Sequence, residues 1–123
     1  MINIDEVKII FDNSDVYKIE EGPNHLKISF EIGELSAQIN IDEELAIVSI
    51  GSWHEMFEDI ESLKNLLNIL LNEKCRLEVL SCGGEEYCWE LQVLIDNEWR
   101  RYSKVRAFKI TFFRKVDKKY FNN

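Results

Sequence analysis

The chain is 123 residues long, with 46 % hydrophobic and 31 % charged residues, which is typical of one folded globular domain and not of a disordered segment. Its net charge of −8 is unevenly spread, because residues 1–63 carry a net −12 and residues 64–123 a net +4. An acidic total argues against a nucleic-acid partner, whose phosphates it would repel, and favours a basic partner for the N-terminal half.

The N-terminal part is predicted to contain an ambiguous first segment and then an antiparallel meander. Ile4, Val7, Ile10 and Phe11 fit helical spacing, but residues 7–11 are equally good strand material, so helix and strand both stay open. After a turn, strands are expected where apolar and polar residues alternate, at residues 16–20, 26–32, 35–41 and 45–50.

One long central helix over about residues 53–72 is the best-defined predicted element. Ser52 and Glu55 form an S-x-x-E capping box, in which each side chain satisfies a backbone amide at the start of a helix. Acidic residues occupy the first half, where the helix dipole favours them, and apolar residues recur every three or four positions. The apolar stripe consists of Met56, Ile60, Leu63, Leu67, Leu70 and Leu71.

The C-terminal half is predicted to return to strands. Residues 75–81 and 87–95 are expected to pair as a hairpin, and Asp96–Asn97 is expected to form a short turn because both residues tolerate a positive φ. Further strands are expected at residues 99–103 and 105–114, followed by a frayed end over residues 117–123. The fold class is therefore α+β: residues 1–123 form a single domain, a mostly antiparallel sheet with the long helix packed on one face.

The sequence offers no strong pattern for catalysis or metal binding. Cys82 and Cys88 lie six positions apart, Cys75 is the third thiol, and neither His25 nor His54 is near them, so a zinc site with four ligands is not expected. The phosphate-binding, dinucleotide-binding, zinc-protease and nucleophile-elbow motifs do not occur. We therefore expect a protein that is not an enzyme, with no catalytic residue, no metal and no cofactor.

Basic and aromatic residues alternate over residues 99–120. Such interleaving can mark a nucleic-acid face, but Phe108 and Phe112 share strand parity with Ile110 and are expected to face the core. The favoured interpretation is a solvated basic strand that pairs with the acidic meander and offsets its charge. A nucleic-acid-binding domain that uses this stretch stays open as the weaker alternative.

These features together favour a protein-binding inhibitor. In size, acidity, α+β composition and lack of catalytic motifs, the chain resembles, as a general type, the small immunity proteins that bacteria keep against nuclease-type toxins. That resemblance implies occlusion: carboxylates fill the cationic active-site groove of a basic protein partner, and charge speeds the association. A phage or mobile-element inhibitor that mimics nucleic acid would use the same carboxylates and stays open as the alternative.

The predicted partner-binding surface is the acidic run around the start of the long helix. Trp53 is an aromatic anchor if it is exposed, although a position at the edge of the core is the favoured interpretation. The candidate residues are Glu43, Glu44, Trp53, Glu55, Glu58, Asp59 and Glu61.

The expected location follows from features that the sequence lacks. The longest apolar cluster, around residues 66–71, is well short of the roughly 18 residues that cross a bilayer, and the first residues have neither the basic nor the apolar region of a signal peptide. Three cysteines cannot all pair within one chain, which favours reduced thiols. We expect a cytoplasmic protein with no membrane partner.

Overall fold

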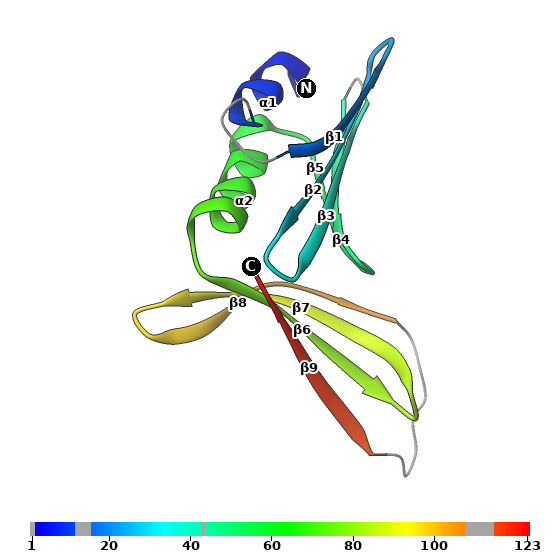
Figure 1. The fold of residues 1–123 in the computed structure, drawn as a ribbon, viewed down its shortest axis with the longest axis vertical. Coiled ribbons are helices and arrows are strands. Elements are labelled where there is room, and N and C mark those ends of the chain that lie inside the picture. The colour runs from blue at the N-terminus through cyan, green and yellow to red at the C-terminus, as the bar shows by residue number, and fades with distance from the viewer. Residues whose placement is uncertain (1, 12–15, 43, 108–114) are drawn as a thin grey trace.

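A computed structural model describes residues 2–11, 16–42, 44–107 and 115–123, and two helices and nine strands lie within those ranges. The α+β fold class is confirmed, but the strands form two antiparallel sheets and not one (Figure 1). In chain order the elements are α1 (Ile4–Phe11), β1 (Val16–Gly22), β2 (His25–Ile32), β3 (Leu35–Ile41), β4 (Ala46–Ile50), β5 (Trp53–Phe57), α2 (Ile60–Asn72), β6 (Cys75–Cys82), β7 (Glu85–Ile95), β8 (Glu98–Arg106) and β9 (Val116–Asn122).

Sheet A is the predicted meander, extended by one strand to the order β1-β2-β3-β4-β5. Its alternating sequence buries one face, so that Leu26, Ile28 and Phe30 of β2 point into the core while the residues between them do not. The register carries the same row across the sheet, since Ile28 pairs with Ile39 and Ile39 with Val48.

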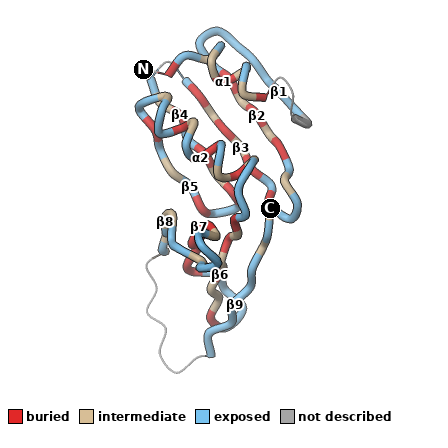
Figure 2. The backbone as a smooth tube through the Cα atoms, turned by 90° about the vertical axis from the view of Figure 1, so that its left-hand side faces the viewer, coloured by how far each residue is buried: buried red, intermediate tan, exposed pale blue. Residues whose placement is uncertain are grey.

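Both helices lie against this buried face of sheet A (Figure 1). The ambiguous first segment is the helix α1, whose Val7 and Phe11 are buried, and the Phe11 ring packs against Phe30 with centroids 5.1 Å apart. Helix α2 buries four leucines along one stripe, each contributing about 2 kcal/mol when fully buried: Leu63, Leu66, Leu67 and Leu70. Figure 2 shows the buried residues along β2 and β3 behind this helix.

The predicted start of the long helix is wrong. Residues 53–57 form strand β5, because Gly51, with φ +59°, closes a tight turn that folds β5 back onto β4. Trp53 and Phe57 are buried on one face, while Met56 between them in the alternation is 60 % exposed, which is strand and not helix periodicity.

The predicted capping box at Ser52 and Glu55 is therefore also wrong. The N-cap of α2 is Asp59, whose side chain accepts a hydrogen bond of 2.9 Å from the Ser62 backbone N–H. The helix has 13 residues and occupies only the second part of the predicted segment.

Sheet B has the order β8-β7-β6-β9 and confirms the predicted β6–β7 hairpin. Asp96 and Asn97 make the predicted turn, with φ of +53° and +65°. Leu77 and Leu91 of sheet B belong to the same core as α1, α2 and sheet A. The tips of the β2–β3 and β4–β5 hairpins approach this inner face of sheet B (Figure 1).

The predicted frayed C-terminal end is wrong, because β9 pairs along the whole of β6. The Asn123 side chain Nδ2 donates to the carbonyls of Leu70 at 3.1 Å and Glu73 at 2.6 Å, and its Oδ1 accepts from the Cys75 N–H at 3.0 Å. Asn123 thereby satisfies carbonyls that the end of α2 leaves open.

The predicted strand over residues 105–114 is only partly described. Val105 and Arg106 belong to β8, and residues 108–114, with Phe108, Ile110 and Phe112, lie outside the described residues.

The expected pairing of the basic strands with the acidic meander is wrong. Strand β8 pairs with β7 and β9 with β6, so the basic C-terminal strands lie in a different sheet from the meander. The charge split is thus a division between layers: residues 1–74, which include sheet A and both helices, carry a net −11, and residues 75–123 carry a net +3.

Candidate functional site

The acidic residues predicted to bind a partner gather at one end of sheet A. Because Ala46 pairs with Phe57, the β3–β4 turn with Glu44 lies at the same end as the junction between β5 and α2, which holds Glu58 and Asp59. Glu44, Glu58, Asp59 and Glu61 are all exposed. Glu43 lies outside the described residues.

Trp53 does not reach this surface, because its side chain has 0 % exposure. Its indole Nε1 donates to the Ser103 carbonyl at 3.3 Å, and its ring packs against Tyr102 with centroids 6.5 Å apart. Trp53 therefore joins β5 to β8 from inside the core and offers no anchor to a partner.

Glu55 is the unusual member of the set. Its position on β5 places it on the same face as the buried Trp53 and Phe57, opposite Val48 of β4. The Tyr102 hydroxyl donates a hydrogen bond to its carboxylate. The Oε2 atom of Glu55 is buried and has no hydrogen-bond partner among the described residues.

Burial governs the titration of this pair. Loss of solvent raises the pKa of Glu55 above its ordinary 4.5, although the bond from Tyr102 partly opposes the shift. Burial, followed by the adjacent Glu55 charge and the hydrogen bond, raises the pKa of Tyr102 to about 12. A carboxylate that lacks full hydration and a second partner is an acceptor for a cation or a hydrogen-bond donor.

Glu55 and Tyr102 line an open groove of about 450 Å³ between β5, the start of α2 and β8. Their partly buried side chains and the buried Phe57 form its inner part. Exposed residues form its rim: Met56, Glu58, Asp59, Ser62 and Asn65. We call this feature the acidic groove.

Asp59 on the rim is held ionised. The Ser62 backbone N–H, and then the Ser62 hydroxyl, hydrogen-bond to its carboxylate and lower its pKa below the ordinary 3.8. Lys64 is the basic residue of α2 that approaches the acids, with its Nζ 3.5 Å from Glu6 and 3.9 Å from Glu61. Lys64 partly offsets the negative charge of Glu61. It does not line the acidic groove, whose lining residues include no basic side chain.

Tyr102 is the functional candidate that sequence patterns miss. It belongs to the basic–aromatic stretch and contacts Glu55 only because β8 and β5 meet between the two sheets. A sequence signal for Glu55 does exist: in strand periodicity it falls between two large aromatics, which is a rare place for a carboxylate.

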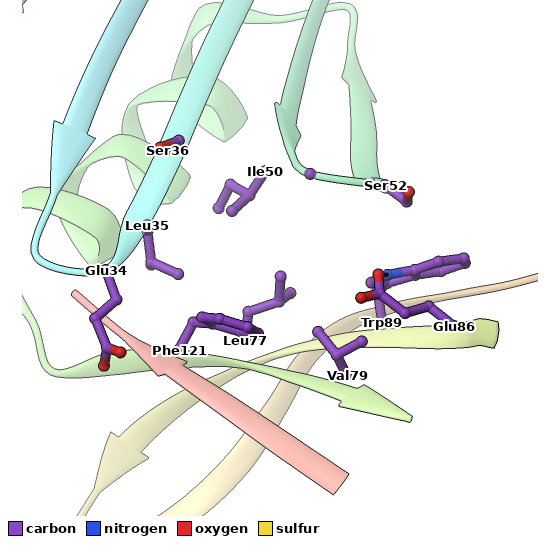
Figure 3. Close-up of a pocket in the computed structure, with 11 residues that line it drawn as sticks. Glu34, Leu35, Ser36, Ile50, Ser52, Leu77, Val79, Glu86, Trp89 and Phe121 are labelled. Atoms are coloured by element: carbon purple, nitrogen blue, oxygen red, sulfur yellow. Dashed lines mark hydrogen bonds between the residues drawn. The ribbon is translucent and has the colours of Figure 1, made fainter. Parts of the chain in front are cut away.

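A second cavity of about 220 Å³ lies at the seam between the sheets (Figure 3). Leu35 and Ile50 face it from sheet A, and Leu77, Val79 and Trp89 face it from sheet B. Glu86 accepts a hydrogen bond of 3.2 Å from Trp89 Nε1 at its edge. The residues predicted to bind a partner do not line it.

Comparison of the chain with protein-family models, with curated proteins and with solved structures gives no match. Within the described ranges, no group of histidine, cysteine and acidic side chains is arranged to hold a metal ion. Neither described helix is long and apolar enough to cross a membrane.

Proposed function

We propose that this protein is a non-enzymatic inhibitor of the immunity type, which binds a basic, nuclease-like protein and blocks its active site. The partner inserts a cationic side chain, lysine or arginine, into the acidic groove beside Glu55. The observation that carries the proposal is Glu55, which lines an open groove and whose buried Oε2 has no hydrogen-bond partner among the described residues. A guanidinium or ammonium group from a partner would satisfy that atom once the Glu55 side chain turns toward the groove.

The groove and its surroundings supply two separate contributions to binding. Exposed carboxylates of Glu44, Glu58 and Asp59 attract a basic surface from a distance and raise the association rate, an effect that salt screens. Glu55 and Tyr102, which are partly buried, set how long the complex lasts, because breaking a charge-assisted contact there leaves a desolvated carboxylate.

A cytoplasmic location is part of the proposal. Cys75, Cys82 and Cys88 are all free and buried, and free thiols persist in a reducing compartment.

Affinity capture with purified, immobilised protein tests the proposal. The wild type, the groove variant Glu55→Gln/Glu58→Gln and the control variant Glu31→Gln/Glu73→Gln are exposed to an extract of the source organism. Both variants lose two acidic groups, but Glu31 and Glu73 are exposed residues that do not line the groove. The proposal expects a basic protein that the wild type and the control retain and the groove variant loses. Equal retention on all three proteins would contradict it.

A further inference from the structure

The outer face of sheet B, which points away from sheet A, carries an ordered array of polar side chains. Leu77 and Leu91 lie in the core, so strand alternation places their neighbours on the outer side. Glu90 and Gln92 of β7 are there, yet each is only 8 % exposed. Buried polar side chains on an outer face require specific partners.

Gln92 connects these partners across the central strands. Its Oε1 accepts a hydrogen bond of 2.7 Å from Arg76 Nε, and its Nε2 donates to Glu90 and, at 3.4 Å, to Glu78. Arg101 of β8 donates its Nε to Glu90. The network therefore links β8, β7 and β6 and holds Arg76 in one orientation.

Two aromatic rings from the edge strands enclose the Arg76 guanidinium. Its carbon Cζ lies 4.1 Å from the Trp99 ring centroid and 4.1 Å from the Tyr120 ring centroid. Tyr120 is 39 % exposed and Trp99 is partly exposed. The terminal nitrogens of Arg76 have no hydrogen-bond partner among the described residues, so they remain available as donors beside two aromatic rings.

The outer face also has an excess of positive charge. Strand register places five basic residues on it: Arg76, Arg101, Lys104, Arg106 and Lys118. Three acidic residues share the face: Glu78, Glu85 and Glu90. Burial would raise the pKa of Glu90, but hydrogen bonds from Gln92 and Arg101 and the charges of Arg101 and Lys104 lower it, so Glu90 stays ionised and orients the array.

We propose that this outer face of sheet B binds single-stranded nucleic acid. Phosphates contact the donors of Arg76 and the exposed lysines Lys104 and Lys118, while unstacked bases lie on the ring faces of Trp99 and Tyr120 that the Arg76 guanidinium does not cover. A sheet face that combines aromatic rings with basic side chains suits single strands, because every base has a face that can stack and duplex bases are not accessible to it.

The expectation against a nucleic-acid partner rests on the net charge, on pairing of the basic strands with the acidic meander, and on Phe108 and Phe112 facing the core, two residues that lie outside the described ranges. The second ground is removed, because sheet B contains none of the meander strands. The first weakens with distance: at 0.1 M salt, charges farther away than about 10 Å are largely screened. The acidic residues of sheet A and α2 therefore reduce the affinity without removing the local attraction.

Fluorescence anisotropy with a labelled oligo-dT of about 15 nucleotides tests the inference. We expect binding at about 50 mM salt that weakens linearly in log–log form as salt rises to about 200 mM. Polyglutamate of matched length is the second probe, because it carries negative charge without bases. Oligo-dT binding at least about tenfold tighter than polyglutamate supports stacking of bases, whereas equal affinities would point to an acidic protein surface and overturn the proposal.

Two matched double variants locate the site. Lys104→Gln/Lys118→Gln removes two charges from the outer face, and Lys18→Gln/Lys27→Gln removes two charges from sheet A, all at positions outside the core. We expect the first variant to bind oligo-dT at least about fivefold more weakly, with the salt slope reduced by about 1 to 2, and the second to change affinity less than twofold. No oligo-dT binding by the wild type, or equal losses in both variants, would contradict the inference. These variants leave the acidic groove intact, so the outcome is independent of the inhibitor proposal.

Discussion

The Tyr102 hydroxyl donates a hydrogen bond to the Glu55 carboxylate, and this contact joins an edge strand of sheet A to an edge strand of sheet B. The bond from Trp53 Nε1 to the Ser103 carbonyl supports the same junction, two residues from Glu55 on β5 and one residue from Tyr102 on β8. The acidic groove therefore exists only when the two sheets are docked, and its chemistry depends on a tertiary contact.

Removing the hydroxyl in Tyr102→Phe should lower the free energy of unfolding by about 1 kcal/mol at neutral pH. The Glu55 carboxylate would then lack its partner, and its pKa should rise further. The missing hydrogen bond destabilises mainly the ionised form of Glu55. The decrease in the free energy of unfolding should therefore become smaller as pH falls and Glu55 becomes protonated. Urea unfolding at neutral and acidic pH measures the difference, and a loss that grows toward acidic pH would exclude this role for the bond.

Replacing Glu55 with Gln should stabilise the free protein at neutral pH. Burial raises the pKa of Glu55 in the folded state above 4.5, so the folded state holds this proton more tightly than the unfolded state. Stability of the wild type therefore declines as pH rises from about 4.5 through the raised pKa, and the neutral Gln escapes that decline. The gain should be below about 1 kcal/mol, because the carboxyl is only partly buried.

Thermal unfolding of wild type and Glu55→Gln across this pH range provides the check. The two melting temperatures should converge in acid and separate as pH rises, with the variant higher. A variant that melts lower at neutral pH would show that the ionised carboxylate stabilises the fold. Glu55 would then already have sufficient partners within the protein, which would contradict its proposed function as a binding site for a cation.

Replacing Asn123 with Ala should cost about 2 kcal/mol or more. The change leaves the carbonyls of Leu70 and Glu73 and the N–H of Cys75 without their present partner. Asn122→Ala is the matched control, since the Asn122 side chain makes one long, exposed contact of 3.4 Å with Glu34, and it should cost less than about 0.5 kcal/mol. Equal losses in urea unfolding would show that Asn123 has no special function at the end of α2.

Gly33 and Gly51 form a second matched pair. Both have positive φ, +57° and +59°, but a Cβ on Gly33 would lie 2.5 Å from the Asn123 carbonyl carbon, whereas a Cβ on Gly51 would meet no atom within 4 Å. Gly51→Ala should therefore cost about 1 kcal/mol from backbone strain alone, and Gly33→Ala clearly more. Similar midpoints in urea would indicate that β9 can withdraw from the β2–β3 turn without loss.

The strands of sheet A and the β6–β7 hairpin could be predicted because their burial follows a local period of two. Residues 53–57 could not, since Met56 extends the apolar stripe of α2 backward from Ile60 and conceals the alternation of Trp53 and Phe57. The tight turn at Gly51 determines that residues 53–57 form a strand and not a helix. It does so only because the turn brings these residues alongside β4, with which they pair.

The acidic residues of the candidate site could be predicted from the sequence, but the contact between Glu55 and Tyr102 could not. Glu55, Glu58 and Asp59 are close in sequence and line one groove. Tyr102 is 47 positions beyond Glu55, and no local sequence pattern indicates that β8 lies in contact with β5. The same holds for Arg76, Trp99 and Tyr120, which three separate strands bring together.

Binding of a guanidinium group in the acidic groove is the central property that the proposed function requires. Titration of ¹⁵N-labelled protein with the peptide acetyl-Gly-Arg-Gly-amide, followed by NMR, measures this, and the same peptide with citrulline in place of arginine removes only the charge. We predict saturable shifts at Glu55, Met56, Ser62, Asn65 and Tyr102, with a dissociation constant of about 1 mM that Glu55→Gln weakens severalfold. Shifts spread over all acidic surfaces, or equal shifts with the citrulline peptide, would contradict the central claim.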